Sequence, residues 1–512
     1  MLIKVFGAAV QGIDATLITI EVNSSRGCMF YLVGLPDSAV KESHQRIISA
    51  LQVNGYRIPT SNIIINMAPA DIRKEGSAYD LPLAIGMLAA GEVIQPDKLN
   101  RYLMMGELSL DGSLQPIKGA LPIAIKAREL GFEGIIVPRQ NALEAAVVNQ
   151  IQVYGVENIK EVIEFFNGKQ ELTPTIVNTR EEFYAQQSSF DLDFADVKGQ
   201  ENVKRALEVA AAGGHNIILI GAPGSGKSML AKRLPSILPP LSLGESLETT
   251  KIHSVAGRLQ NSTGLISKRP FRDPHHTIST VAMTGGGSYP QPGEISLAHN
   301  GILFLDELPE FNRSVLEVLR QPLEDRKITI SRVKSNVEYP ASFMLVASMN
   351  PCPCGYYNHP TKACVCSPGQ VQKYLNRISG PLLDRIDLQI EVVPVPFEKM
   401  SDAHPGEASS IIRERVISAR QIQENRYADI PGVYCNAQMS SKLLSLYARP
   451  DDKGLALLKN AMNRLNLSAR AYDRILKVAR TIADLENSDL IQPSHLAEAI
   501  GYRNLDREDW AG

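Results

Sequence analysis

The residues with the clearest capacity for chemistry form a glycine-rich loop, Gly221-Ala222-Pro223-Gly224-Ser225-Gly226-Lys227-Ser228. The loop follows an apolar run at 216–220 and precedes a helical pattern that begins at Met229. Glycines in such a loop let backbone N–H groups approach phosphate oxygens, and the start of a helix favours negative charge. Lys227 then reaches the β and γ phosphates of ATP, and Ser228 offers its hydroxyl to Mg²⁺. The loop predicts an ATP site; the alternative is a glycine-rich turn without a ligand.

Two carboxylates, Asp306 and Glu307, follow a strongly apolar run at 301–305. A parallel sheet would present them beside the phosphate loop, where Asp306 suits Mg²⁺ and Glu307 suits polarising the attacking water. Strands that end in two acids are common, so this interpretation depends on the phosphate loop. Asn350 ends a third apolar run, where its amide could hold the same water. We predict that Lys227, Asp306, Glu307 and Asn350 are catalytic.

Four of the six cysteines lie in one short stretch, as Cys352, Cys354, Cys364 and Cys366. Four thiolates in one loop predict a tetrahedral Zn²⁺ site. Each pair is Cys-x-Cys, a spacing that strains simultaneous ligation, so free thiols or a redox loop are the alternative. Cys28 and Cys435 stand apart, and we expect both to be buried apolar residues. Secreted disulfide scaffolds do not cluster their cysteines in this way, which indicates a reducing compartment.

Residues 327–341 alternate apolar and polar side chains around a short basic tip. This pattern is typical of a β-hairpin. The basic residues of this tip are Arg332 and Lys334, which are candidates for contact with nucleic-acid phosphates. The alternative is an exposed edge hairpin protected by its charges. An insertion in the sequence carries Arg272, His275 and His276. We interpret it either as a second pore loop or as a hydrogen-bonded turn.

The composition limits the class of protein. The chain has 512 residues, of which 44% are hydrophobic and 21% charged, as in an ordinary globular protein. Its 53 Lys and Arg residues against 55 Asp and Glu residues exclude a chain-wide basic field for nucleic acid. No apolar run approaches the roughly 20 residues of a membrane span. We therefore expect a cytoplasmic protein without a membrane partner.

Periodicity divides the chain into three domains and a linker. Residues 1–168 have α/β patterning, and the polar, aperiodic stretch 169–195 predicts the linker. Residues 196–395 alternate buried strands with helices and glycine-rich turns, which predicts a parallel sheet with helices on both faces and a cysteine-rich insertion at 352–366. Residues 396–512 are almost wholly helical and predict a helical lid.

The motifs together resemble an AAA+ ATPase, with the addition of Leu383-Asp-Arg-Ile-Asp387 and a helix that starts Ser468-Ala-Arg470. Segments 269–276 and 285–301 and the cysteine stretch resemble, more closely, the magnesium-chelatase-like ComM/YifB family, over nearly the whole chain. The resemblance implies ATP and Mg²⁺ as cofactors and a homo-hexameric ring.

The resemblance also implies roles for single residues. Arg385 matches the arginine finger, which enters the neighbouring subunit's nucleotide site; the alternative is an ion pair with Asp384 or Asp387. Arg470 matches the sensor-2 arginine, with Arg474 as its rival. Gly199 and Gln200 match the backbone that holds adenine.

The basic hairpin resembles the one before sensor 1 in MCM-type helicases, where a lysine at the position of Lys334 touches the nucleic-acid backbone. The resemblance implies that copies of Lys334 and Arg332, repeated around a ring, would line its pore with positive charge without making the monomer basic. Residues 1–168 resemble the proteolytic domain of Lon, a fold that the RadA recombination protein uses without proteolysis. Segments 65–81 and 110–121 match those that carry Lon's Ser-Lys dyad, but this chain has Ala78 and Leu121 at the two positions. Ser77 and Lys118 lie one and three residues away from these positions. A shift of the alignment by one residue would therefore restore the serine of the dyad, and a shift by three would restore its lysine. We expect a binding or ring-forming platform.

The resemblance implies an ATP-driven hexameric DNA motor, a helicase or branch-migration factor in recombination during natural transformation or DNA repair. Its partners would be single-stranded or branched DNA and recombination proteins. One alternative is a chelatase-type or protein-remodelling ATPase that acts on a protein. The second is a Lon-like ATP-dependent protease, against which the missing dyad argues.

Overall fold

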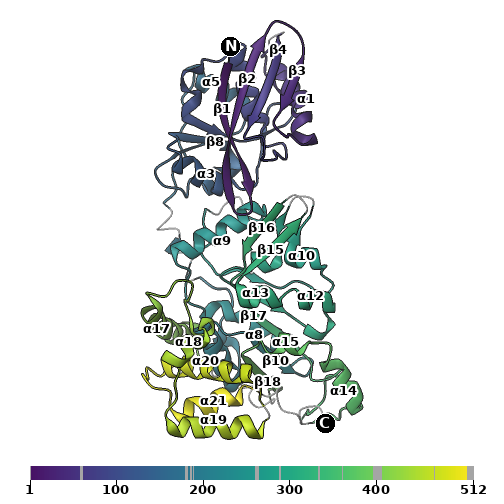
Figure 1. The fold of residues 1–512 in the computed structure, drawn as a ribbon, viewed down its shortest axis with the longest axis vertical. Helices are drawn as coiled ribbons and strands as arrows, with labels where there is room; N and C mark the ends of the chain where they lie inside the picture. Colours follow the sequence, from purple (N-terminus) through teal and green to yellow (C-terminus); the bar gives the residue numbers. More distant parts are fainter. Residues whose placement is uncertain are drawn as a thin grey trace. The chain divides into compact units, whose positions relative to one another are not determined.

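The computed structural model describes residues 2–57, 61–178, 183–184, 187, 189–259, 264–287, 290–332, 335–359, 361–395, 406–465 and 467–503, without the side chains of Arg332 and Ser335. The chain forms two compact units, coloured along the sequence in Figure 1. The first unit comprises Met1–Gln186, Leu243–Ser267 and Pro290–Pro292. The second comprises Gln187–Ser242, Lys268–Tyr289 and Gly293–Gly512.

The first unit is built on a seven-stranded mixed sheet with the order β3-β4-β2-β1-β5-β8-β9. Its strands are β1 (Leu2–Gln11), β2 (Asp14–Ser25), β3 (Phe30–Val33), β4 (Asn62–Ala68), β5 (Tyr102–Met104), β8 (Gly134–Pro138) and β9 (Gln152–Val156). Strands β1, β2 and β4 pair antiparallel, whereas β3 joins β4, and β5, β8 and β9 extend the sheet from β1, in parallel. A small hairpin joins β6 (Glu107–Leu108) and β7 (Leu114–Gln115).

The helices of the first unit are α1 (Ser38–Val53), α2 (Asp80–Ala90), η1 (Pro96–Arg101), α3 (Ala120–Glu129), α4 (Arg139–Ala145), α5 (Ile159–Phe166) and α9 (Leu243–Val255). Every residue of α2 is buried. A helix that is buried on all sides forms the centre of a core rather than its cover. Helix α2 packs on β1 and β2, so the core of this unit lies between that helix and the sheet.

The second unit contains a five-stranded parallel sheet with the order β11-β14-β17-β10-β18. Its strands are β11 (Phe271–Arg272), β14 (Ile302–Leu305), β17 (Met344–Met349), β10 (Ile217–Gly221) and β18 (Leu388–Val392). Strands β10, β14 and β17 are buried along their whole length. Continuous apolar strands of this kind are expected where helices cover both faces of a parallel sheet.

Helices and short elements around this sheet are η2 (Phe194–Asp196), α7 (Glu201–Gly213), α8 (Lys227–Arg233), η3 (Leu234–Ile237), α10 (Thr280–Thr284), α11 (Glu294–Leu297), η4 (Leu308–Glu310), α12 (Arg313–Glu317), α13 (Arg320–Asp325), α14 (Pro368–Leu375) and α15 (Gly380–Leu383). The second unit also contains β12 (Gly285–Gly286) and a hairpin of β15 (Lys327–Arg332) with β16 (Ser335–Pro340), whereas β13 (Gln291–Pro292) belongs to the first unit.

The C-terminal region is helical, with α17 (Ser409–Tyr427), η5 (Asn436–Gln438), α18 (Ser441–Tyr447), α19 (Asp452–Arg464), α20 (Ala469–Leu485) and α21 (Pro493–Gly501). Helices α17 and α20 both pack on α7. Their buried side chains share one core with the parallel sheet. The predicted α/β fold with a helical C-terminal region is confirmed.

Segment Leu243–Ser267 belongs to the first unit, although both neighbouring stretches of chain belong to the second. Helix α9 of this segment packs on α3. The carbonyl of Ser254 accepts a hydrogen bond from the N–H of Gly119 at 3.1 Å, and the Ser254 hydroxyl bonds the buried carboxylate of Glu144. The predicted boundaries put this segment in the ATPase domain because sequence periodicity follows contiguous chain and does not register which core a helix joins.

No helix among the described residues is both long enough and apolar enough to cross a lipid bilayer.

Candidate nucleotide site

The predicted phosphate loop joins β10 to α8. Gly224 and Gly226 have φ angles of 80° and 92°, which residues with a side chain rarely adopt. A Cβ atom on Gly221 would lie 2.4 Å from the carbonyl oxygen of Val392 on the neighbouring strand. The loop therefore needs glycine at these positions for its own shape.

Lys227 lies at the start of α8 with its amine turned back onto the loop. Its Nζ donates to the carbonyl oxygens of Gly221 at 2.7 Å and Ala222 at 2.9 Å, and to Oδ1 of Asn350 at 3.4 Å. Burial lowers the pKa of Lys227, and the nearby carboxylates of Asp306 and Glu307 oppose this shift. The structure thus brings Lys227, at the start of α8, together with Asn350, which directly follows β17.

Ser228 and Asp306 form the pair that is expected to hold Mg²⁺. The Ser228 hydroxyl donates to Oδ2 of Asp306 at 2.7 Å. The other oxygen, Oδ1, accepts from the hydroxyl of Ser348 and from the backbone N–H of Glu307, the latter at 3.0 Å. A hydroxyl and an oriented carboxylate suit a hard divalent cation.

The sequence prediction missed Ser348. It lies on β17, which is otherwise apolar and pairs with β14 so that Ala347 is opposite Leu305. A polar residue in a fully buried strand next to the Asp-Glu strand is a signal that could have identified it.

Glu307 has a left-handed backbone, with φ 55° and ψ 49°. Left-handed conformations of residues other than glycine are strained and cluster at functional sites. Its Oε2 atom lies 3.6 Å from Nδ1 of His276. The His276 ring is tilted by 34° against that of His275, and the two ring centroids are 4.1 Å apart. His275 itself bonds the hydroxyl of Thr277 at 2.9 Å, as in a hydrogen-bonded turn.

Gln200 lies beside the phosphate loop. Its Nε2 donates to the carbonyl oxygen of Val393 at 2.6 Å and to that of Ser225 at 3.4 Å. Gly199 and Gln200 both have positive φ angles, 65° and 61°, directly before α7. Their role in holding adenine stays a prediction.

Arg385 is nearly buried, with 8% of its surface exposed. Its Nη2 is paired with the carboxylate of Glu324, and its Nη1 donates to the carbonyl oxygen of Pro381 at 2.5 Å. Its Nε is buried without a hydrogen-bond partner in the described part of the chain. The alternative interpretation was wrong about the partner, because neither Asp384 nor Asp387 pairs with Arg385.

Those two aspartates pair instead with the two sensor-2 candidates. Arg470 bonds Asp384 at 3.0 Å, and its side chain is 66% exposed. Arg474 bonds the buried Asp387 at 2.9 Å. Burial of Asp387 favours its neutral form, but the charge of Arg474, together with a hydrogen bond from His215 and the charge of Lys477, outweighs this and keeps the pKa well below its usual range. Of the two arginines, only Arg470 has a largely exposed side chain.

The predicted basic hairpin is present as β15 and β16, in antiparallel register from Lys327 opposite Pro340 to Arg332 opposite Ser335. Lys334 and the side chain of Arg332 lie outside the described residues. Their contact with DNA therefore stays a prediction.

The four clustered cysteines converge. The sulfur of Cys352 lies 3.3 Å from that of Cys354 and 3.7 Å from that of Cys364, which are 3.5 Å from each other. With Cys366, all four sulfurs lie within 4.8 Å of one another. The Cys-x-Cys spacing therefore does not prevent the four thiols from meeting.

The expectation for Cys28 was wrong, because this residue is exposed, whereas Cys435 is buried as expected.

In the first unit, Leu121 is buried on α3 and its backbone N–H donates to the Glu144 carboxylate at 2.9 Å. Lys118 lies against Gly257 of the α9 segment.

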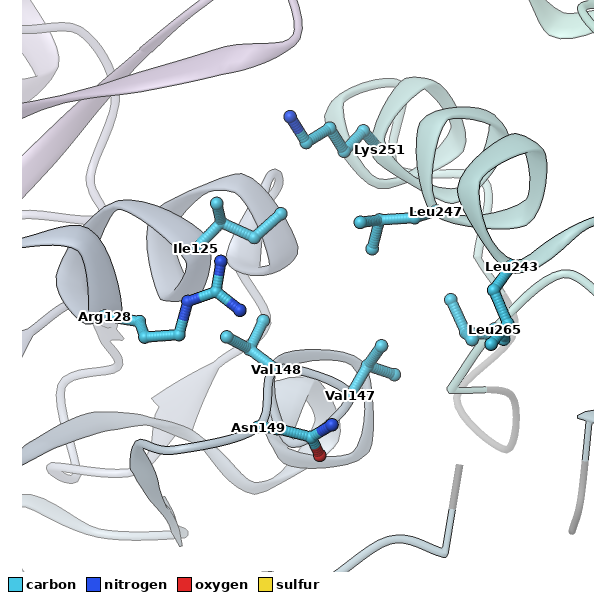
Figure 2. A pocket seen from close by; sticks show the side chains of 9 residues that line it. All are labelled: Ile125, Arg128, Val147, Val148, Asn149, Leu243, Leu247, Lys251 and Leu265. Carbon is cyan, nitrogen blue, oxygen red and sulfur yellow. The ribbon is translucent and has the colours of Figure 1, made fainter. Parts of the chain in front are cut away.

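A cavity of about 270 Å³ lies farther along α3, between that helix and α9. Figure 2 shows Ile125 and Arg128 on one side and Leu247 and Lys251 on the other. Its lining contains neither Ala78 nor Leu121, the positions of the Lon dyad, and is completed by Val147, Val148, Asn149, Leu243 and Leu265.

Three family profiles match the chain. They are "Magnesium chelatase, subunit ChlI" over 193–400, "Subunit ChlI of Mg-chelatase" over 20–141 and "Magnesium chelatase, subunit ChlI C-terminal" over 406–503. Together they cover both units.

Single relatives agree with these profiles. The chain is 44% identical to competence protein ComM of Haemophilus influenzae, over 98% of this chain and 97% of the relative. It is also 44% identical to the uncharacterized protein YifB of Escherichia coli, over 98% and 96% of the two chains. A shorter match, 29% identical over 25% of this chain, is to Lon protease 2 of Bacillus subtilis and covers 23% of that protein. The chain belongs to the ComM/YifB family of magnesium-chelatase-like AAA+ proteins.

Proposed function

We propose that this chain is a hexameric ATPase that uses ATP hydrolysis to move DNA through the centre of its ring, as a helicase or branch-migration factor. The observation that carries the ATPase part is the 2.7 Å hydrogen bond between Ser228 and Asp306, next to the amine of Lys227. These groups come from the phosphate loop and from the end of β14. Ser228 and Asp306 would hold Mg²⁺, which would supply positive charge to neutralise the β and γ phosphates.

The remaining roles follow from position. Lys227 binds the phosphates, Glu307 orients and polarises the attacking water, and Asn350 helps to hold that water. Gly199 and Gln200, beside Ser225 of the loop, contact the base. Arg385 acts on the nucleotide of the neighbouring subunit, and Arg470 responds to the nucleotide from the start of α20.

Two observations support DNA as the moved substrate. In the sequence, Lys334 falls between β15, which ends at Arg332, and β16, and repetition of these basic residues around a ring would gather positive charge that the monomer, with a net charge of -2, does not have. One full-length relative is named a competence protein, which fits recombination during natural transformation. DNA repair, recombination proteins as partners and a cytoplasmic location are part of the same proposal.

The Cys352–Cys366 loop is proposed to bind one Zn²⁺ through its four thiolates, because their sulfurs lie within 4.8 Å of one another.

ATP turnover measured without DNA and with single-stranded, duplex and branched DNA tests the proposal. We expect turnover that requires Mg²⁺, is abolished by Lys227→Ala and is stimulated by DNA, most by the structure on which the motor acts. Turnover that no DNA stimulates, together with no DNA binding, would favour the second candidate, an ATPase that remodels a protein partner.

A further inference from the structure

The cysteine cluster is close to the ATP site in both sequence and space. Cys352 follows Asn350 after a single residue, Pro351, and is completely buried. Asn350 in turn accepts a hydrogen bond from the amine of Lys227 at 3.4 Å. One end of the cluster is therefore attached directly to a residue of the predicted catalytic set.

A second contact runs from the cysteine loop to the phosphate loop itself. A Cβ atom on Gly355 would lie 2.5 Å from Cδ and 2.8 Å from Cγ of Pro223, so the backbone at Gly355 packs against the proline ring without space for a side chain. Gly355 is buried and has a φ of 84°, which favours glycine for a second reason. The position of Pro223 in the phosphate loop thus depends on the path of the cysteine loop.

A third contact closes the far end of the loop. Helix α14 begins at Pro368, shortly after Cys366, and carries Tyr374. Burial raises the pKa of Tyr374 to about 12, and a backbone hydrogen bond from Asn350 acts against that rise. Asn350, which precedes the loop, is therefore in contact with the helix that follows it.

The loop has little regular structure of its own to hold this arrangement. No helix or strand occurs between β17 and α14 among the described residues. The three sulfur separations, 3.3, 3.7 and 3.5 Å, are far above a disulfide bond of about 2.05 Å. They are near the roughly 3.8 Å between sulfurs in a tetrahedral site with Zn–S bonds of about 2.3 Å.

We infer that a tetrahedral metal ion on the four cysteines fixes the positions of Asn350 and of the phosphate loop, so that nucleotide binding and hydrolysis depend on its presence. The inference rests on the proposed ATPase function and goes beyond it, because it assigns the metal a control over the ATP site. Structural metal sites supply folding energy to the loops that carry them. Loss of the metal ion would therefore disrupt both the contact of Asn350 with Lys227 and the contact of Gly355 with Pro223.

The first test removes the metal. Wild-type protein, Cys354→Ser and Cys364→Ser are compared for zinc content by mass spectrometry, for affinity for a fluorescent ATP analogue and for turnover. Cys28→Ser is the matched control, because Cys28 is a free cysteine outside the cluster. We expect zinc in the wild type and the control, and its loss in both cluster variants. Turnover should fall by about ten- to a hundredfold, the range that displaced reacting groups cost.

The second test breaks the contact and keeps the metal. Gly355→Ala removes no thiolate but places a methyl group against Pro223, and we expect retained zinc with weakened nucleotide binding. Gly432→Ala is its control, because Gly432 has a similar φ of 78° and nothing within 4 Å of the added Cβ. If the cysteine variants do not fold, a zinc-selective chelator applied to folded wild type, followed by added ZnCl₂, replaces them.

The outcomes separate the inference from the proposed function. Absence of zinc in the wild type, or zinc-free protein that binds the ATP analogue as well as the wild type does, overturns the inference. Wild type that contains zinc and binds the analogue but shows no turnover contradicts the ATPase proposal. In that case the analogue affinities of Gly355→Ala and Gly432→Ala still decide the inference.

Discussion

Arg385 and Glu324 form an ion pair within one chain. The arginine side chain is 9% exposed, whereas that of the glutamate is 55% exposed, on α13. A buried guanidinium with one N–H unsatisfied is held at a cost of about 1–3 kcal/mol. The proposed action of Arg385 on a neighbour's nucleotide requires it to leave Glu324, and the unsatisfied N–H reduces the free energy that this departure costs.

Arg385→Ala should therefore leave ATP affinity nearly unchanged and reduce turnover by about a thousandfold, because an arginine finger acts on the transition state. Arg377→Ala, which removes an exposed arginine paired with Glu310 at 2.8 Å, is the control and should retain activity. Mixtures of inactive Arg385→Ala and inactive Lys227→Ala should recover part of the turnover through mixed interfaces. A flat mixing curve at constant total protein contradicts a site shared between subunits.

Lys227→Ala and Glu307→Gln should fail in different ways. The first loses the amine that contacts phosphate and should not bind ATP tightly, whereas the second should bind ATP and stall, because the carboxylate that polarises water is gone. Equilibrium binding of an ATP analogue and steady-state turnover distinguish the two. Wild-type turnover of Glu307→Gln would remove this residue from the catalytic set.

Ser348→Ala should raise the Mg²⁺ concentration needed for half-maximal turnover by about tenfold. The Ser348 hydroxyl bonds Asp306, and residues that orient a metal ligand typically contribute about 10- to 100-fold to metal affinity. A Mg²⁺ titration at saturating ATP measures the effect. The exposed serine of Ser445→Ala is the control, and equal titration curves for the two variants would count against an orienting role for Ser348.

Lys334→Ala should retain basal turnover and lose DNA stimulation, because contact with phosphate requires positive charge without base specificity. Removal of one lysine–phosphate interaction should reduce the slope of log affinity against log salt by about 0.7 to 0.9. Lys327→Ala is the control on the same hairpin, since its amine is already paired with Glu338 at 3.0 Å. Equal slopes and equal unwinding of a branched substrate would remove the hairpin from the DNA path.

The sequence was sufficient for those parts of the site that are local in the chain. Short stretches of consecutive residues encode the phosphate loop, the Asp306-Glu307 pair and the hairpin. The parallel sheet then places strand ends together by topology, which is why Lys227, Asp306 and Asn350 could be grouped before the structure was known.

The relationships that could not be predicted connect residues far apart in the chain. Ser348 reaches Asp306 only through the register of β17 and β14, and Glu324 reaches Arg385 across an interval of 61 residues. The contact of Gly355 with Pro223 depends on the path of an irregular loop, for which no periodicity exists. The exposure of Cys28 was missed for a related reason, since residue type does not determine burial in a connection between strands.

Helix α9 belongs to the first unit but lies between two segments of the second, and this limits how the chain can be cut into fragments that fold. The chain passes from the first unit to the second, returns for Leu243–Ser267, and returns once more for Pro290–Pro292. A fragment that stops at residue 168 therefore lacks the partner of α3 and leaves Ile125 and Val147 uncovered where Leu247 normally lies. The two units are interleaved along the chain, so the second unit cannot be removed as one contiguous piece without also removing α9, which packs on α3 in the first unit.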